Sequence, residues 1–319
     1  MNSSIWRRAS LILVLTTLAS CQAGENVSFY SDDVALRLDL TEEKLTILQL
    51  TDLHLTFGVD YNDRKTFQLI EALVDYAEPD LVVFSGDQSM APFGPILFQR
   101  LAHVVEALDV PWTFVFGNHD NDHAPYEKYL ANLENYENLL FKVGPELVDG
   151  GFGNFKIETY FDNLPFYNLY LLDTHAETTG DLEYGWLSAA QVAWYEEKAS
   201  VDQLANIYSS VFMHIPLMEY EEYVNTTLND GKIVEGIYHQ GMNTGFFQAM
   251  VDHGVSQAVF VGHDHLNTFS FYHQGILLAY GAATGYNGYG NTPKGGRIIE
   301  IDASNTLVTN LVFDTEVEI

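Results

Sequence analysis

Short apolar runs alternate with amphipathic stretches in the N-terminal half of the chain. The apolar-rich runs at 44–50, 81–84 and 112–116 predict strands, and the continuous apolar run at 81–84 is typical of a strand that is covered on both faces. Between these runs, apolar residues at helical spacing predict helices over about 65–76 and 96–108. This β-α-β-α-β order predicts a largely parallel sheet that binds its ligands at the carboxyl ends of the strands.

The C-terminal half is richer in strands. The apolar pattern predicts strands within 155–160, 166–173, 210–213, 258–261, 269–280 and 297–313, the last with a hairpin-like turn at Asn305. It predicts helices over about 189–198 and 246–251. No repeat, low-complexity tract or linker divides the sequence, so we expect a single domain over 44–319, preceded at 21–43 by a tether and the start of the domain.

The composition indicates an acidic protein with a sizeable core. The chain has 319 residues, of which 47% are hydrophobic, and its formal net charge is −30 from 14 basic and 44 acidic residues. Binding to a phosphate backbone needs Lys and Arg to release counterions, so this balance argues against a nucleic-acid partner. The acidic excess predicts a self-repelling, soluble surface.

The first residues resemble the signal of a bacterial lipoprotein. Two arginines precede an apolar stretch at 11–18 that is too short to span a bilayer, and Leu-Ala-Ser then leads to Cys21, the single cysteine of the chain. The resemblance implies that residues 1–20 are removed and that Cys21 carries a lipid anchor to the membrane. It implies an exported protein, located at the outer membrane on its periplasmic face or at the surface. An ordinary secretory signal with a chance cysteine is the alternative.

Polar side chains of metal-ligating type follow five of the predicted strands. They are Asp52, His54, Asp87, Asn118, His119, His214, His263 and His265. Side chains alternate along an extended chain, so the two D-x-H and H-x-H pairs each point to one side. Any one motif is also explained as a turn, because Gly, Asn and Asp dominate turns. All five at successive strand ends predict a site that binds metal and moves protons.

These motifs resemble those of the calcineurin-like metallophosphoesterase family, whose pattern is D-x-H, G-D, G-N-H-[DE], H and G-H-x-H. The resemblance covers about 44–315 and implies an α/β fold, a four-layer α/β/β/α sandwich with two mixed sheets. It assigns one metal ion to Asp52, His54, Asp87 and His265. It assigns the second to Asp87, Asn118, His214 and His263, with Asp87 bridging the two ions.

The family's chemistry implies a phosphatase that hydrolyses phosphomonoesters, and the lipoprotein-like signal implies that it is exported. Two divalent ions generate a bridging hydroxide that attacks the ester. His119 is the predicted general acid, and Asp120 is a candidate to orient it. The ligands include no thiolate, so Zn, Mn, Fe and Co all stay open. A phosphodiesterase acting on cyclic nucleotides or glycerophosphodiesters would use the same site, and a non-catalytic binding lipoprotein would keep the same scaffold.

A narrower resemblance is to phosphatases related to the purple acid phosphatases. It rests on Tyr184-Gly185-Trp186-Leu187 and on the glycine-rich stretch 281–290. Purple enzymes carry D-x-G first and a tyrosine three residues after the bridging aspartate, where this chain has His54 and Met90. The purple colour should therefore be absent.

Further residues in loops after predicted strands are candidates to line the substrate pocket. They are His123, His175, Tyr286 and Tyr289. Trp186 and Trp194 have helix-like spacing and are expected in the core.

Overall fold

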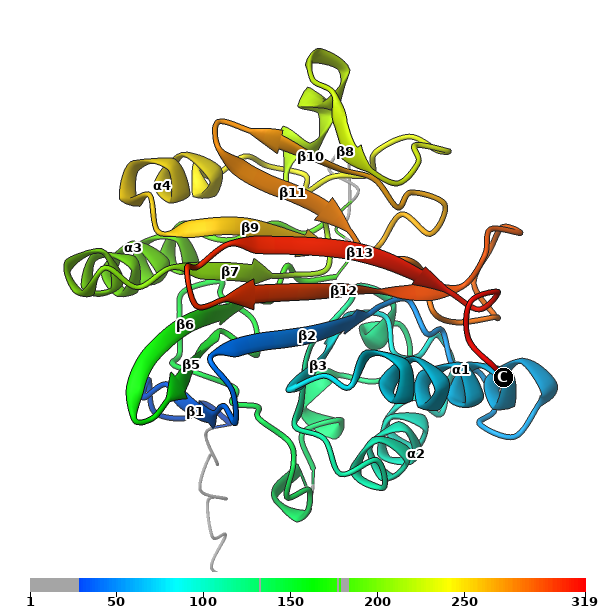
Figure 1. Cartoon of the computed structure of the whole chain (residues 1–319). Helices are drawn as coiled ribbons and strands as arrows, with labels where there is room; N and C mark the ends of the chain where they lie inside the picture. Colours follow the sequence, from blue (N-terminus) through cyan, green and yellow to red (C-terminus); the bar gives the residue numbers. More distant parts are fainter. Residues whose placement is uncertain (1–28, 132, 177, 179–183) are drawn as a thin grey trace, which may run out of the picture.

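Two β-sheets pack face to face, and helices cover the outer face of each (Figure 1). The computed structural model describes residues 29–131, 133–176, 178 and 184–319. The predicted signal 1–20 and Cys21 lie outside the described residues.

The smaller sheet contains the three predicted parallel strands of the N-terminal half. Its strand order is β13-β12-β2-β3-β4, with β12 antiparallel to both β2 and β13. Its strands are β2 (Lys44–Leu50), β3 (Leu81–Ser85), β4 (Trp112–Val115), β12 (Gly295–Asp302) and β13 (Leu307–Phe313). The sheet is therefore mixed, with β2 at its centre.

The larger sheet is also mixed, and its order is β1-β5-β6-β7-β9-β11-β10-β8. Strands β6, β7, β9 and β11 run parallel, and β5 and β10 pair antiparallel with β6 and β11. Its strands are β1 (Leu36–Asp39), β5 (Phe155–Phe161), β6 (Leu164–Leu171), β7 (Ser209–Phe212), β8 (Leu228–Asp230), β9 (Ser256–Val261), β10 (Ser270–His273) and β11 (Ile276–Tyr280).

Helices α1 (Tyr61–Ala77) and α2 (Gly94–Glu106) cover the smaller sheet, and α3 (Ala189–Ala205) and α4 (Phe246–His253) cover the larger one (Figure 1). Helix α1 starts earlier than predicted because Asp60 accepts hydrogen bonds from the first-turn amides. Short 3₁₀ turns are η1 (His119–Asn121), η2 (Tyr126–Lys128), η3 (Leu133–Asn135) and η4 (Met218–Asn225). In the described part of the chain, no helix has the length and apolar content that a membrane crossing requires.

Three apolar layers hold these elements together. Between the sheets, Ile47 and Val83 of the smaller sheet pack with Phe212 and Phe260 of the larger one, all fully buried. The other two layers lie between each sheet and its own helices, and Trp194 belongs to the layer under α3 and α4. The predicted sandwich with two mixed sheets is confirmed.

The described segment before β2 packs against the rest of the domain. Tyr30 stacks on Phe152 with ring centroids 5.5 Å apart, and Asp33 accepts a hydrogen bond of 2.8 Å from Trp194 Nε1. Strand β1 then joins the larger sheet beside β5. Residues 30–39 therefore belong to the domain.

Candidate metal centre

Loops at the carboxyl ends of β2, β3, β4, β7 and β9 bring the predicted ligands together. Four of these residues have a left-handed backbone: φ is 54° at Asp52, 47° at His54, 55° at Asp87 and 77° at His263. Such a conformation costs about 1–3 kcal/mol at each non-glycine residue, so the surrounding fold must hold it. These conformations aim the side chains into the space between the loops.

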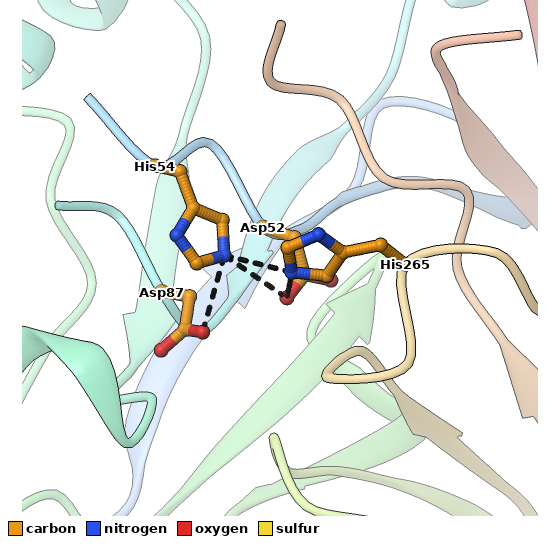
Figure 2. Close-up of side chains that lie close together, drawn as sticks. All are labelled: Asp52, His54, Asp87 and His265. Carbon is orange, nitrogen blue, oxygen red and sulfur yellow. Dashed lines mark hydrogen bonds and ion pairs between the residues drawn. The ribbon is translucent and has the colours of Figure 1, made fainter. Parts of the chain in front are cut away.

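Four side chains form a first cluster, in which they point toward one another (Figure 2). His54 Nε2 lies 2.8 Å from His265 Nε2 and 3.3 Å from Asp87 Oδ2. Asp52 Oδ1 lies 3.4 Å from His265 Nε2. The four potential ligand atoms all lie within 4.8 Å of one another, and all four residues are buried. This nitrogen and oxygen set fits one divalent cation.

A second cluster shares Asp87 with the first. His214 Nε2 lies 3.3 Å from Asp87 Oδ2 and 3.1 Å from Asn118 Oδ1, and His263 Nδ1 lies 2.9 Å from Asn118 Oδ1. Asp87 Oδ2 is thus at the same distance from a histidine of each cluster. The seven predicted ligands therefore converge, with Asp87 in the place of a bridging carboxylate.

Contacts behind the clusters orient the ligands. His214 Nδ1 donates to the carbonyl oxygen of Ser85 at 2.8 Å, which leaves its Nε2 for a metal. The backbone amide of His119 donates to Asp87 Oδ1 at 2.9 Å. A Cβ at Gly117 would lie 2.2 Å from the backbone nitrogen of Asp87, so only glycine permits this approach.

The carboxylates and imidazoles of the two clusters shift one another's pKa values strongly. Burial raises the pKa values of Asp52 and Asp87, but neighbouring imidazoles outweigh it and hold both well below their usual range. Burial lowers the pKa values of His54 and His214, yet the two carboxylates raise them to about 10 and about 9. Metal ions must displace these protons in order to bind. Burial and the charge of His214 lower the pKa of His263 to about 3, so this ligand is neutral.

His119 lies beside the clusters but pairs with a different carboxylate than predicted. The ring centroids of His119 and His54 are 5.2 Å apart, and His119 Nδ1 lies 2.7 Å from Asp122 Oδ2. Residues three apart eclipse in a 3₁₀ turn, which places Asp122 beside His119. Asp120 is buried and accepts from the Gly117 amide at 2.9 Å, and burial together with the charge of Asp87 raises its pKa to about 8. In this structure the carboxylate beside the His119 ring is therefore that of Asp122, and Asp120 instead holds backbone amides.

A cavity of about 360 Å³ opens beside the clusters. It is lined by Asp87, Asn118, His119, Tyr184, Glu235, Tyr238, His263, Asp264, His265 and Tyr289. Among the described residues that line it, none is Lys or Arg. Tyr184, Glu235 and Tyr238 line the cavity although they were not predicted to do so. Glu235 and Tyr238 lie in an irregular loop after β8, where no periodicity marks a residue as facing the site.

The predicted pocket residues have different positions. Tyr289 lines the cavity, and its ring stacks on that of His265 at 4.2 Å. Tyr286 instead packs at the edge of the core beside α1, and its hydroxyl donates to Asp314 at 2.6 Å. His175 lines another cavity, of about 550 Å³, together with Trp186. His123 is exposed and does not line the metal-site cavity. Of the four predicted residues, only Tyr289 lines the metal-site cavity.

Comparison with known proteins decides the family. A sequence model of the calcineurin-like phosphoesterase family matches residues 45–267. The chain belongs to this family. This calcineurin-like phosphoesterase is 28% identical over 340 residues to probable inactive purple acid phosphatase 14 of Arabidopsis thaliana, covering 92% of this chain and 82% of that protein. It is 31% identical over 314 residues to phosphatase DCR2 of Saccharomyces cerevisiae, covering 86% of this chain and 54% of that protein.

Solved structures share the fold. A dimetal phosphatase from Danio rerio aligns with a TM-score of 0.57 at 13% identity, over 83% of this chain and 98% of that one. A purple acid phosphatase from yellow lupin aligns with a TM-score of 0.50 at 12% identity, over 86% of this chain and 52% of that one. The expected resemblance to the family and to purple acid phosphatases is confirmed.

Proposed function

We propose that this phosphoesterase is a dinuclear-metal phosphatase that hydrolyses phosphomonoesters. The observation that carries the proposal is the position of Asp87, whose Oδ2 lies 3.3 Å from both His54 Nε2 and His214 Nε2. One ion would be held by Asp52, His54, Asp87 and His265, and the other by Asp87, Asn118, His214 and His263. When bound, such ions activate water and neutralise phosphoryl charge.

His119 holds and moves the proton in this proposal. Its ring lines the cavity, and its Nδ1 is engaged by Asp122, so Nε2 is the nitrogen that can give a proton to the leaving alkoxide. Its backbone amide holds Asp87 Oδ1. One residue thus combines proton donation with the orientation of the shared ligand.

A non-catalytic binding role is the second candidate, because the Arabidopsis relative is named inactive. The convergence of the seven ligand positions and the place of His119 in the cavity support the enzymatic role instead. A phosphodiesterase would use the same metal set. The metal could be Zn, Mn, Fe or Co, since the donor set contains no thiolate.

The test measures metal content and hydrolysis together. The purified protein is expected to contain about two equivalents of metal and to hydrolyse p-nitrophenyl phosphate faster than the bis-ester, with loss of activity in chelator. Asp87→Asn should lose metal and activity, whereas Asp75→Asn on the exposed face of α1 should keep both. Full metal content without turnover of either ester would support the binding role, and faster bis-ester turnover would support the diesterase.

We also propose that the protein is exported and anchored by a lipid on Cys21. The support is the sequence of residues 1–21. Labelled palmitate should enter the parent protein and not Cys21→Ala. Release of both proteins in soluble form would contradict the anchor.

A further inference from the structure

Aromatic side chains form the outer part of the metal-site cavity. Tyr238 and Tyr289 are 46% and 51% exposed, whereas the metal ligands of the lining are buried. Tyr184 completes the group, with its ring 6.4 Å from that of Tyr238. The tyrosine rings therefore lie where a molecule bound at the metal ligands can rest against them.

Two of these rings touch metal-ligand histidines directly. The Tyr289 ring stacks on that of His265 at 4.2 Å, and the Tyr184 ring meets that of His263 edge-on at 4.5 Å. The aromatic wall therefore begins next to both clusters. The alcohol part of an ester whose phosphate is held by the clusters would lie against this wall.

A carboxylate is fixed within the same wall. Glu235 accepts hydrogen bonds from the Tyr289 hydroxyl at 2.9 Å and from the Leu266 amide at 2.7 Å. An ionised carboxylate has about four acceptor sites, so these contacts leave it able to bind a further donor or cation. Apart from the metal ligand Asp87, the lining has one more acidic residue, Asp264, which accepts hydrogen bonds from the Tyr280 hydroxyl at 2.5 Å and from the Tyr238 amide at 3.3 Å.

This combination discriminates between kinds of leaving group. A neutral apolar group would desolvate Glu235 without compensating its charge, which is unfavourable. A polyanionic group would meet the carboxylate of Glu235 and, among the described lining residues, no Lys or Arg. A cationic group would satisfy Glu235 and would also be attracted to the faces of the tyrosines.

We propose that Glu235 with Tyr184, Tyr238 and Tyr289 selects phosphomonoesters whose alcohol carries an ammonium group, of which phosphocholine is the representative. This inference rests on the proposed phosphatase function. It assigns the metal ligands to the phosphate and the tyrosine–glutamate wall to the cation.

The first experiment compares phosphocholine with its neutral isostere, 3,3-dimethylbutyl phosphate. We expect kcat/KM to be about tenfold or more higher for phosphocholine, the scale of a partly desolvated cation–π contact with a carboxylate. Glu235→Gln should reduce this ratio to about twofold, and Tyr238→Leu should also reduce it. Glu196→Gln, on the exposed face of α3, removes the same charge elsewhere and should leave the ratio unchanged. Equal rates for the two esters, or a ratio that Glu235→Gln leaves intact, would overturn the assignment.

The second experiment measures binding without catalysis. Choline should bind the zinc-loaded protein in a calorimetric titration about tenfold more tightly than 3,3-dimethylbutanol, and Glu235→Gln should abolish the difference. Selective choline binding to a protein that hydrolyses no ester would refute the proposed function and keep the cation site. Hydrolysis of p-nitrophenyl phosphate without any preference for choline would refute the cation site alone.

Discussion

The contact between His119 and Asp122 leads to a prediction that a double-mutant cycle can measure. The perturbations are His119→Ala, Asp122→Asn and both together. If Asp122 acts only by holding the His119 ring, its replacement should matter in the parent and have no effect once the imidazole is gone. Asp122 is then a positioning residue, and His119 is the residue that touches the substrate.

The structure sets the size of each effect. The Nδ1–Oδ2 distance is 2.7 Å, but the side chains are 34% and 36% exposed, so solvent weakens the pair. Removing it should cost about 0.2–1 kcal/mol of folding free energy. Loss of a general acid costs about 10²–10⁴ in rate, so His119→Ala should lose this much on an alkyl phosphate. Asp122→Asn keeps the imidazole and should lose about tenfold, or about 1.4 kcal/mol.

The assay compares an alkyl phosphate with p-nitrophenyl phosphate at full metal occupancy. A good leaving group needs little protonation, so every variant should lose far less on p-nitrophenyl phosphate. The double variant should match His119→Ala on both substrates. Equal turnover of the alkyl phosphate by His119→Ala and the parent would refute the general-acid role. Additive losses in the double variant would refute the positioning role of Asp122.

Four other predictions follow from single contacts or positions. Gly117→Ala should lose metal at least tenfold while keeping its circular dichroism, because the new Cβ would lie 2.2 Å from the Asp87 nitrogen; normal metal content would contradict this. Lys156→Met should lower the free energy of unfolding, measured in urea, by about 3–5 kcal/mol. The reason is that Lys156 Nζ lies 3.0 Å from buried Asp202, which the substitution leaves without its charge partner. A loss below about 1 kcal/mol would contradict this prediction. Chelation should lower the melting temperature reversibly, since metal at 100 times its Kd adds about 2.7 kcal/mol, and an unchanged transition would count against bound metal. The iron-loaded protein should show no purple absorption band, because Met90 stands where purple enzymes have tyrosine.

The sequence pattern predicted the elements that carry the ligands, because these elements depend on local periodicity. The predicted strand over 44–50 has the bounds of β2, and each ligand follows a strand that the apolar pattern marks. Strand β1 was missed because it is four residues long and only one of them is buried. The strand predicted within 269–280 is a pair, β10 and β11, because a turn with φ of 47° at Gln274 and 87° at Gly275 divides it.

The cavity lining could not be predicted in the same way. Glu235 contacts Leu266 and Tyr289, which are far along the chain, through a loop without repeating pattern. The Asp122 contact depends on the 3₁₀ turn after β4, and the sequence Asn-His-Asp-Asn-Asp offers two carboxylates without showing which one lies beside His119. Side-chain direction in irregular loops is decided by tertiary packing.

The contacts of the ligand residues exclude the simpler explanation that these motifs only form turns. A turn-forming Asp or Asn bonds its own backbone within a few residues. Asp52 instead contacts His265, and Asn118 contacts His214 and His263, across separate loops. The backbone of Asp52 is left-handed, which costs about 1–3 kcal/mol. A turn held by local hydrogen bonds does not need this conformation at Asp52. A bound cation would stabilise the converging side chains and so offset the cost of this backbone conformation. A metal centre therefore explains both the contacts between the loops and the left-handed backbone.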